Sequence, residues 1–198
     1  MSQASLESRD VATRVQEILD CLERSAHMDY IGEDVSQLEH ALQCAELAKR
    51  ASTDDETILA ALLHDIGHFC SKEDVPQMNG FGSVSHEKIG ADYLRDLGFS
   101  DRVCQLVLGH VEAKRYLVFK HARYAEKVSY ASQQTLLQQG GPMDDVEAAA
   151  FEQDPMFKEK LRIRQWDDSG KIEDYTPPSL ETYRELLTQH LNQTGHSA

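Results

Sequence analysis

The residues best suited to chemistry lie at the end of an apolar run, in the stretch Leu62-Leu63-His64-Asp65-Ile66-Gly67-His68. Adjacent imidazole and carboxylate groups can bind one transition-metal ion, or two ions through a bridging carboxylate. His68 follows His64 by about one helical turn, so the two rings share a face if the helix continues through Gly67. A lone pair of this kind is more often a buried histidine with a carboxylate partner, so its meaning depends on what accompanies it.

Further ligands of the same chemical type are spread along the chain. Five of the nine histidines are expected at or near helix ends: His40, His64, His68, His86 and His110. Asp167 follows near the end of a later predicted helix. Imidazole and carboxylate without thiolate suit iron, manganese or zinc better than calcium or magnesium. With Asp65 bridging, six protein ligands suffice for two metals and leave positions open for substrate or water.

Helices must position these side chains, because apolar residues recur at helical spacing and strand patterns are nearly absent. The stretch Ser36-Gln37-Leu38-Glu39 fits a capping box, and Gly98 is expected to end a helix. Residues 70–85 are expected to form a loop that could act as a lid. We predict an all-α fold, a single domain over residues 1–198. The expected helices cover 8–26, 36–48, 53–63, 86–97, 100–116, 121–131, 148–151, 156–166 and 180–191.

Composition limits the class of protein. A chain of 198 residues supports one well-buried core, and a net charge of −14 argues against a nucleic-acid partner. The sequence shows neither a membrane-length apolar run nor the apolar core of a signal peptide. The four cysteines show no zinc-finger spacing and are expected to be reduced thiols. We therefore expect a cytoplasmic protein with no membrane partner.

The order His40, His64-Asp65, Asp167 resembles the metal-binding pattern of the HD-domain superfamily, most of whose members are phosphohydrolases. His86 and His110 match its dinuclear arrangement. More closely, the chain is similar to the mixed-valence di-iron oxygenases of the PhnZ/TmpB type, which cleave the carbon–phosphorus bond of 1-hydroxy-phosphonates. The likeness covers about residues 25–190. It is carried by Tyr30-Ile31-Gly32-Glu33, Gln37-Leu38-Glu39-His40, His64-Asp65-Ile66-Gly67-His68, Ser85-His86-Glu87-Lys88, Gly109-His110-Val111-Glu112-Ala113-Lys114-Arg115-Tyr116-Leu117, Gln139-Gly140-Gly141-Pro142-Met143-Asp144 and Ile163-Arg164-Gln165-Trp166-Asp167.

The resemblance implies an HD-type helical bundle that holds two iron ions as an Fe(II)/Fe(III) pair, with O2 as co-substrate. The ligands that it implies are His40, His64, Asp65 and Asp167 for one iron, and Asp65, His86 and His110 for the other.

A small organophosphonate is the partner that this resemblance implies. Lys114 lies one turn after His110 and can reach a substrate at the second iron, and Arg164 offers a guanidinium that suits a pair of phosphonate oxygens. The side chains of Ser132 and His68 would complete the anion pocket with hydrogen bonds.

The resemblance also implies roles for residues at the other end of the site. Tyr30 would cover the open iron position until substrate arrives, and Glu33 would receive a cationic nitrogen. Asp34 adds a second negative charge beside Glu33. Diffuse negative charge favours a trimethylammonium group, which cannot donate hydrogen bonds. Asp34 could equally be the N-cap of the next helix.

The expected reaction converts (R)-1-hydroxy-2-(trimethylammonio)ethylphosphonate and O2 into glycine betaine and phosphate. The same reaction on (R)-2-amino-1-hydroxyethylphosphonate, which would give glycine, is the first alternative. An HD-type phosphohydrolase that uses His40, His64, Asp65 and Asp167 to activate water is the second. A regulatory module without catalysis ranks last, because all six ligand positions are filled.

Overall fold

The computed structural model describes residues 9–30, 34–70, 76, 78 and 83–195. The protein is all-α, which confirms the predicted fold class, and within these ranges the extended pairing is limited to one bridge between Asp29 and Ser36. The α-helices are α2 (Val11–Arg24), α3 (Gln37–Arg50), α4 (Asp55–Leu63), α5 (His86–Asp96), α6 (Asp101–Lys120), α7 (Ala122–Ala125), α8 (Tyr130–Leu136), α9 (Asp145–Glu152), α10 (Phe157–Ser169) and α11 (Arg184–Thr194). Short 3-10 helices are η1 (Ser25–His27), η2 (Ile66–His68) and η3 (Leu180–Tyr183).

Side chains that satisfy free backbone N–H groups determine where several helices begin. Ser36 and Glu39 form the predicted capping box, in which each side chain accepts the backbone N–H of the other residue. Asp54 and Ser100 accept backbone N–H groups at the starts of α4 and α6. Gly98, with φ at +87°, follows α5 as predicted. These caps fix the ends of the helices that carry the histidines.

One helix boundary and the expected continuation of another helix need correction. The helix expected over about 121–131 is in fact two helices, α7 and α8, because the Ser129 hydroxyl accepts the N–H of Ser132 and starts a new helix there. The helix before the His-Asp pair ends at Leu63, as expected. It does not continue to His68, which belongs to the separate turn η2.

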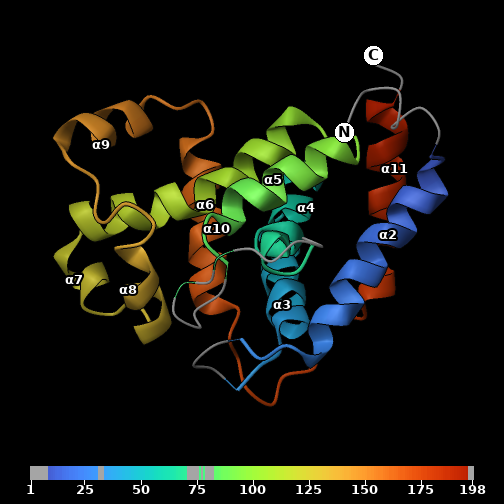
Figure 1. Cartoon of the computed structure of the whole chain (residues 1–198), viewed down its shortest axis with the longest axis horizontal. Helices are drawn as coiled ribbons and strands as arrows, with labels where there is room; N and C mark the ends of the chain where they lie inside the picture. Colours follow the sequence, from blue (N-terminus) through green and yellow to red (C-terminus); the bar gives the residue numbers. More distant parts are fainter. Residues whose placement is uncertain (1–8, 31–33, 71–75, 77, 79–82, 196–198) are drawn as a thin grey trace.

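Helix α4 lies at the centre of the core, and every residue from Thr57 to Leu63 is buried. Helices α3, α6 and α10 pack against it, while α2 and α11 lie side by side at one flank and α7, α8 and α9 gather at the other (Figure 1). The larger of two buried apolar clusters extends from Val15 in α2 to Leu191 in α11, and a smaller one joins α6 to α9. Because the larger cluster includes both the first and the last described helices, it supports the proposal of a single domain.

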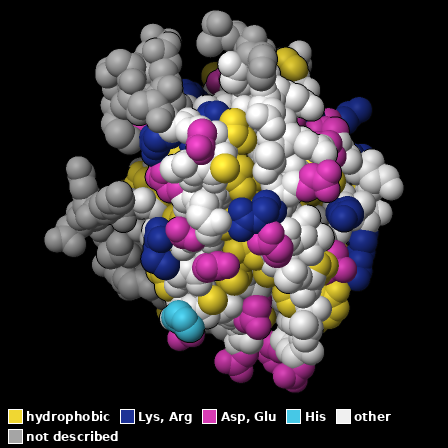
Figure 2. Space-filling model, turned by 90° about the vertical axis from the view of Figure 1, so that its right-hand side faces the viewer, with side chains coloured by type: hydrophobic (Ala, Val, Ile, Leu, Met, Phe, Trp, Pro, Cys, Tyr) yellow, Lys and Arg dark blue, Asp and Glu magenta, His cyan; other side chains and the backbone are white. Residues whose placement is uncertain are grey.

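The face toward α2 and α11 carries acidic and basic side chains interspersed with apolar ones (Figure 2). All four cysteines are free, as expected. Among the helices that the structure describes, none has the length and apolar content needed to cross a bilayer.

The turn η2 lies directly against α5. A Cβ atom added to Gly67 would lie 1.8 Å from the carbonyl oxygen of His86 and 2.7 Å from the nitrogen of Gly90. Gly67 therefore permits a backbone approach that any side chain would prevent. The approach places Asp65 and His86, which come from different elements, next to one another.

We expect Gly67→Ala to lower the free energy of unfolding by about 3 kcal/mol or more, because the added methyl group meets backbone rather than a movable side chain. Gly90→Ala, whose nearest contacts would be 3.1–3.2 Å, should cost about 1 kcal/mol. Urea unfolding of the metal-free proteins measures both. Equal stability of Gly67→Ala and the wild type would contradict the packing described.

Candidate metal centre and active site

The six side chains expected from the sequence to bind metal are brought together in the interior. Each is at most 6 % exposed: His40, His64, Asp65, His86, His110 and Asp167. They come from the first turn of α3, the end of α4, the residue after it, the start of α5, the middle of α6 and the end of α10. His110 is thus a mid-helix residue, not one near a helix end as the sequence suggested.

The carboxylate of Asp65 lies between two pairs of imidazoles. Its Oδ2 atom lies 3.3 Å from Nε2 of His64 and 3.7 Å from Nε2 of His40. Its Oδ1 atom lies 3.4 Å from Nε2 of His86 and 3.6 Å from Nε2 of His110. Asp167 joins the first pair, with Oδ1 3.6 Å from Nε2 of His40. One carboxylate oxygen therefore faces each pair, as a bridge between two cations requires.

Backbone carbonyls orient three of the four rings. Since a ring nitrogen that faces a carbonyl oxygen must carry a proton, the Nε2 atom of each of these rings is an unprotonated lone-pair donor whenever the ring is neutral. The Nδ1 groups donate over 2.7–2.9 Å, from His40 to Gly170, from His64 to Ala61 and from His110 to Val107.

The Nε2 atoms face one another at 3.2 Å between His40 and His64 and at 3.0 Å between His86 and His110. Two lone pairs at such distances repel unless a proton or a metal ion lies between them. Burial alone would lower the pKa of His64, but the nearby carboxylates of Asp65 and Asp167 together outweigh burial and raise the pKa to about 9. The His64 ring therefore carries a second proton, which can lie between the two Nε2 atoms of the first pair. Burial lowers the pKa of His110 to about 4 and that of His86 as well, so the second pair is neutral. This donor set fits two metal ions, and binding the first would release a proton.

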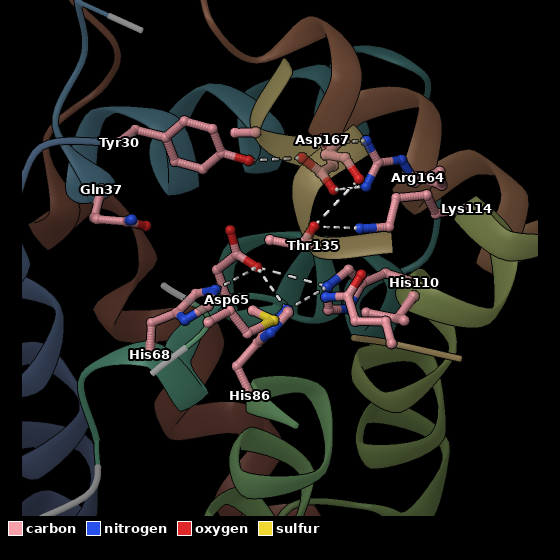
Figure 3. A pocket seen from close by; sticks show the side chains of 15 residues that line it. Tyr30, Gln37, Asp65, His68, His86, His110, Lys114, Thr135, Arg164 and Asp167 are labelled. Atoms are coloured by element: carbon pink, nitrogen blue, oxygen red, sulfur yellow. Dashed lines mark hydrogen bonds and ion pairs between the residues drawn. The ribbon is translucent and has the colours of Figure 1, made fainter. Parts of the chain in front are cut away.

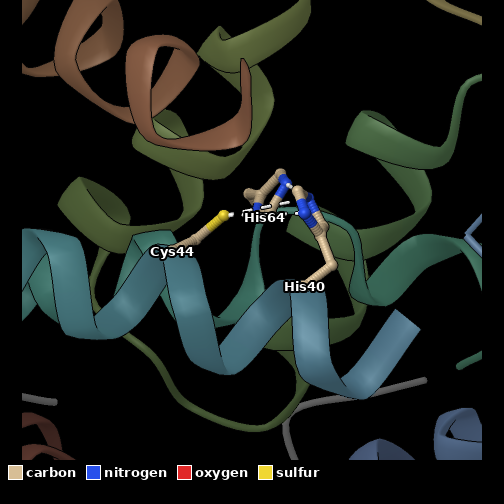
Figure 4. A group of neighbouring side chains, drawn as sticks. All are labelled: His40, Cys44 and His64. Atoms are coloured by element: carbon tan, nitrogen blue, oxygen red, sulfur yellow. Dashed lines mark hydrogen bonds between the residues drawn. The ribbon is translucent and has the colours of Figure 1, made fainter. Parts of the chain in front are cut away.

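Cys44 lies near His40 and His64 but is a poor candidate ligand (Figure 4). Its Sγ atom is 3.8 Å from Nε2 of His40 and donates to the carbonyl oxygen of Trp166 at 3.4 Å. Burial raises the pKa of this thiol well above its ordinary value, with the nearby Asp167 adding to the effect. A thiol held in this form is not a metal-binding thiolate.

His68 lies at the site but in the opposite tautomer. Its Nδ1 atom accepts the backbone N–H of Ser83 at 3.0 Å, so the neutral ring carries its proton on Nε2. That Nε2–H lies 4.0 Å from Oδ1 of Asp65, and the ring stacks on His86 with centroids 3.9 Å apart. His68 is therefore a hydrogen-bond donor at the pocket, not a further ligand.

A pocket opens on the metal centre, and its wall on one side is cationic (Figure 3). Nζ of Lys114 donates to the Thr135 hydroxyl at 3.0 Å, and burial together with the neighbouring Arg164 lowers the pKa of Lys114 to about 7. Arg164 donates to Asp167 Oδ2 at 2.6 Å and to the Ser132 hydroxyl at 3.4 Å, and its guanidinium also forms an ion pair with Asp168. Two cations and two hydroxyl groups on one wall suit a small oxyanion.

Tyr30 closes the other side of the pocket. Its hydroxyl donates to Asp167 Oδ1 at 3.2 Å, and its ring lies against that of His40 with centroids 4.1 Å apart. Nζ of Lys171 lies 4.8 Å from the centroid of the Tyr30 ring. Burial raises the pKa of the Tyr30 phenol well above its ordinary value, so the phenol is neutral.

The two acidic residues expected at this end of the site are Glu33 and Asp34. Glu33 lies outside the described residues. Asp34 is exposed and lines a separate outer depression with Asp29, Glu39 and Tyr30, not the pocket beside the metal centre. The alternative role of Asp34 as a helix N-cap is wrong, because Ser36 caps α3.

The pocket also includes residues to which the sequence analysis gave no role: Gln37, Met78, Thr135 and Gln139. Thr135 lies three residues after Ser132 on the same side of α8, a spacing that could have identified it. The side chains of Gln37 and Gln139 each have a buried Oε1 atom without a hydrogen-bond partner among the described residues. In Figure 3, Gln37 lies across the pocket from Lys114.

The chain is similar to known proteins over most of its length. The family model for the HD domain matches residues 38–149. Hydroxymethylphosphonate dioxygenase of Gimesia maris is 40% identical over 89% of this chain and 87% of its own. The glycine-betaine-forming [1-hydroxy-2-(trimethylamino)ethyl]phosphonate dioxygenase of Leisingera caerulea is 36% identical over 90% of both chains. An uncharacterised protein of Acanthamoeba polyphaga mimivirus is 38% identical over 94% of this chain and 86% of its own.

We expect Fe(II), added without oxygen at about 100 times its Kd, to raise the Tm of the metal-free protein by about 5–10 °C, since such binding stabilises a domain of this size by about 3 kcal/mol. Asp65→Ala should abolish most of this shift, because it removes the oxygen atoms between both imidazole pairs. Differential scanning calorimetry measures the shift, with Ca²⁺ as the control ion that imidazoles bind weakly. An equal response of Asp65→Ala and the wild type would contradict the proposed centre.

Proposed function

The chain belongs to the HD-domain family, and we propose that it is an O2-dependent di-iron oxygenase that cleaves the carbon–phosphorus bond of a small 1-hydroxy-phosphonate. The observation that carries this proposal is the position of Asp65, with one oxygen toward each imidazole pair, beside a pocket wall that carries Lys114 and Arg164. The proposal therefore combines a set of ligands for two metal ions with a binding site for an anion.

The six buried ligands would hold the two irons, with His40, His64 and Asp167 on one side of Asp65 and His86 and His110 on the other. When bound, the iron pair would supply the redox chemistry with O2 that side chains alone lack. The protein's part is to hold these donors in one tautomer and away from bulk water.

The cationic wall would bind the phosphonate group. Lys114 and Arg164 offer charge-assisted hydrogen bonds, and each contacts a hydroxyl group, Lys114 that of Thr135 and Arg164 that of Ser132. A bound phosphonate would favour the charged form of Lys114, whose pKa of about 7 leaves it only partly charged in the free protein. The Nε2–H group of His68 is a further donor to an oxygen of the substrate near Asp65.

A substrate anchored in this way directs its remaining carbon substituent toward Tyr30 and Gln37 (Figure 3). The phenol of Tyr30 would cover the metal centre until substrate enters, held by its hydrogen bond to Asp167. Because Tyr30 lines both the pocket and the outer acidic depression, its displacement would connect the two.

We retain (R)-1-hydroxy-2-(trimethylammonio)ethylphosphonate, which would give glycine betaine and phosphate, as the first candidate substrate, in line with the name of the Leisingera relative. The 2-amino analogue, which would give glycine, is the alternative. It has support from the Oε1 atom of Gln37, which has no hydrogen-bond partner among the described residues, since a primary ammonium can donate a hydrogen bond there and a trimethylammonium cannot. The name of the Gimesia relative adds hydroxymethylphosphonate as a third compound to test.

A metal-dependent phosphohydrolase remains the rival function, because the same ligands could activate water. The two functions differ in their need for iron and oxygen. In the oxygenase reaction the carbon–phosphorus bond breaks, C1 becomes a carboxylate and the phosphorus gains an oxygen, so one O2 is consumed for each phosphate released. A hydrolase would release phosphate from phosphate esters without O2.

We expect the iron-loaded protein to consume O2 and to release phosphate in equal amounts with at least one of the three phosphonates. An oxygen electrode and a phosphate assay on the same samples measure the ratio. Phosphate release from esters under argon, or no oxygen uptake by protein that holds two irons, would overturn the oxygenase.

We expect Lys114→Met to lower kcat/KM by about 10–100-fold, mainly through a higher KM, because it removes a charged hydrogen bond to the anion. In the wild type, kcat/KM should fall as the pH rises through about 7, since Lys114 loses its charge above its lowered pKa. Lys114→Arg stays charged and should lose this fall. An identical pH profile in Lys114→Arg and the wild type would show that another group is responsible.

A further inference from the structure

His86 differs from the other three histidines of the centre. No backbone carbonyl orients its ring among the described residues; instead, its Nδ1 atom lies 3.5 Å from Oε2 of Glu87. The Glu87 carboxylate comes from the first turn of α5, directly after His86. Its side chain is only 18 % exposed.

Both atoms of this contact are buried, and neither has a hydrogen-bond partner within the described part of the chain. A buried polar atom left unpaired destabilises the folded protein. The neutral ring of His86 has one proton but two neighbouring acceptors: Oε2 of Glu87 on one side and Nε2 of His110, at 3.0 Å, on the other. Wherever the proton resides, two lone pairs face one another on the opposite side of the ring.

We propose that Glu87 is a positioning residue for the second metal ion, a role that rests on the di-iron function proposed above. Its carboxylate accepts the Nδ1–H group of His86 and thereby leaves the Nε2 lone pair of that ring for the metal shared with His110 and Asp65. One cation then satisfies Nε2 of both histidines, and the proton satisfies Glu87. When the metal is present, Nδ1 of His86 and Oε2 of Glu87 therefore form a hydrogen bond with each other.

A carboxylate behind a metal-binding histidine fixes the ring and makes it a stronger ligand than a carbonyl partner does. The centre is thus asymmetric. In the described residues, the pair of His40 and His64 is supported by carbonyl groups, with Asp167 as an additional charged neighbour. The pair of His86 and His110 lacks such a neighbour and receives its additional negative charge through Glu87.

A simpler explanation for Glu87 is that an acid in the first turn stabilises α5 through the helix dipole. Such an acid needs no burial, and Asp55 in the first turn of α4 shows the usual arrangement, being exposed. The buried and unpaired Oε2 atom of Glu87 is costly for that purpose alone. Asp55→Asn therefore serves as a matched control that removes a first-turn charge far from any ligand.

The test compares Glu87→Gln and Asp55→Asn with the wild type, using Fe(II) in the absence of oxygen. Iron bound per chain is measured against a competing chelator, and the Tm of each protein is recorded with and without iron. We expect Glu87→Gln to retain one iron at wild-type affinity and to bind the second about 10–100-fold more weakly. Its iron-induced rise in Tm should shrink, while its metal-free Tm should equal that of Asp55→Asn or exceed it.

The outcomes separate this proposal from the function on which it rests. Two irons in the wild type, bound equally well by Glu87→Gln, would overturn the role of Glu87 and leave the oxygenase in place. A metal-free Tm of Glu87→Gln far below that of Asp55→Asn, with unchanged iron affinity, would show a structural role only. A wild type that holds no second iron would overturn both.

Discussion

The arrangement of this protein depends on one buried carboxylate, that of Asp65. A charge in the interior is stable only where positive charge compensates it. The Nε2 atoms of four imidazoles lie around its two oxygens, where a proton on His64 or bound metal ions would supply that positive charge. The contacts around Asp65 bring α3, α4, α5 and α6 together at one point, and α10 adds Asp167. The close approach at Gly67, where no side chain would fit, brings the two imidazole pairs within reach of the same residue.

The same centre connects the two ends of the pocket. Asp167 receives hydrogen bonds from Arg164 on the cationic wall and from Tyr30 on the opposite wall. An anion bound to Arg164 would therefore compete with Asp167 for the guanidinium group. Asp167 in turn helps to hold Tyr30. We propose that substrate binding and the uncovering of the metal centre by Tyr30 are linked through this one carboxylate.

Much of this could be predicted from the sequence, because the signals are local. The capping box of Ser36 and Glu39 and the glycine after α5 act within a few residues, and the six candidate ligands are all imidazoles or carboxylates, a recognisable set of metal donors. The break between α7 and α8 was missed, since the competing cap at Ser129 lies within an otherwise helical pattern. The tautomers of the histidines, and the Oε1 atom of Gln37 that lacks a partner in the described part of the chain, depend on contacts between distant segments, which no spacing reveals. Asp34, adjacent in sequence to a residue implied at the site, lies outside the pocket.

The central claim is that Asp65 lies between two metal ions. Anomalous diffraction at the iron edge from crystals of the iron-loaded protein tests it directly. We expect two separate iron peaks, one beside each oxygen of Asp65, with His40 and His64 at one and His86 and His110 at the other. A single peak, or a peak at the Sγ atom of Cys44, would contradict the account.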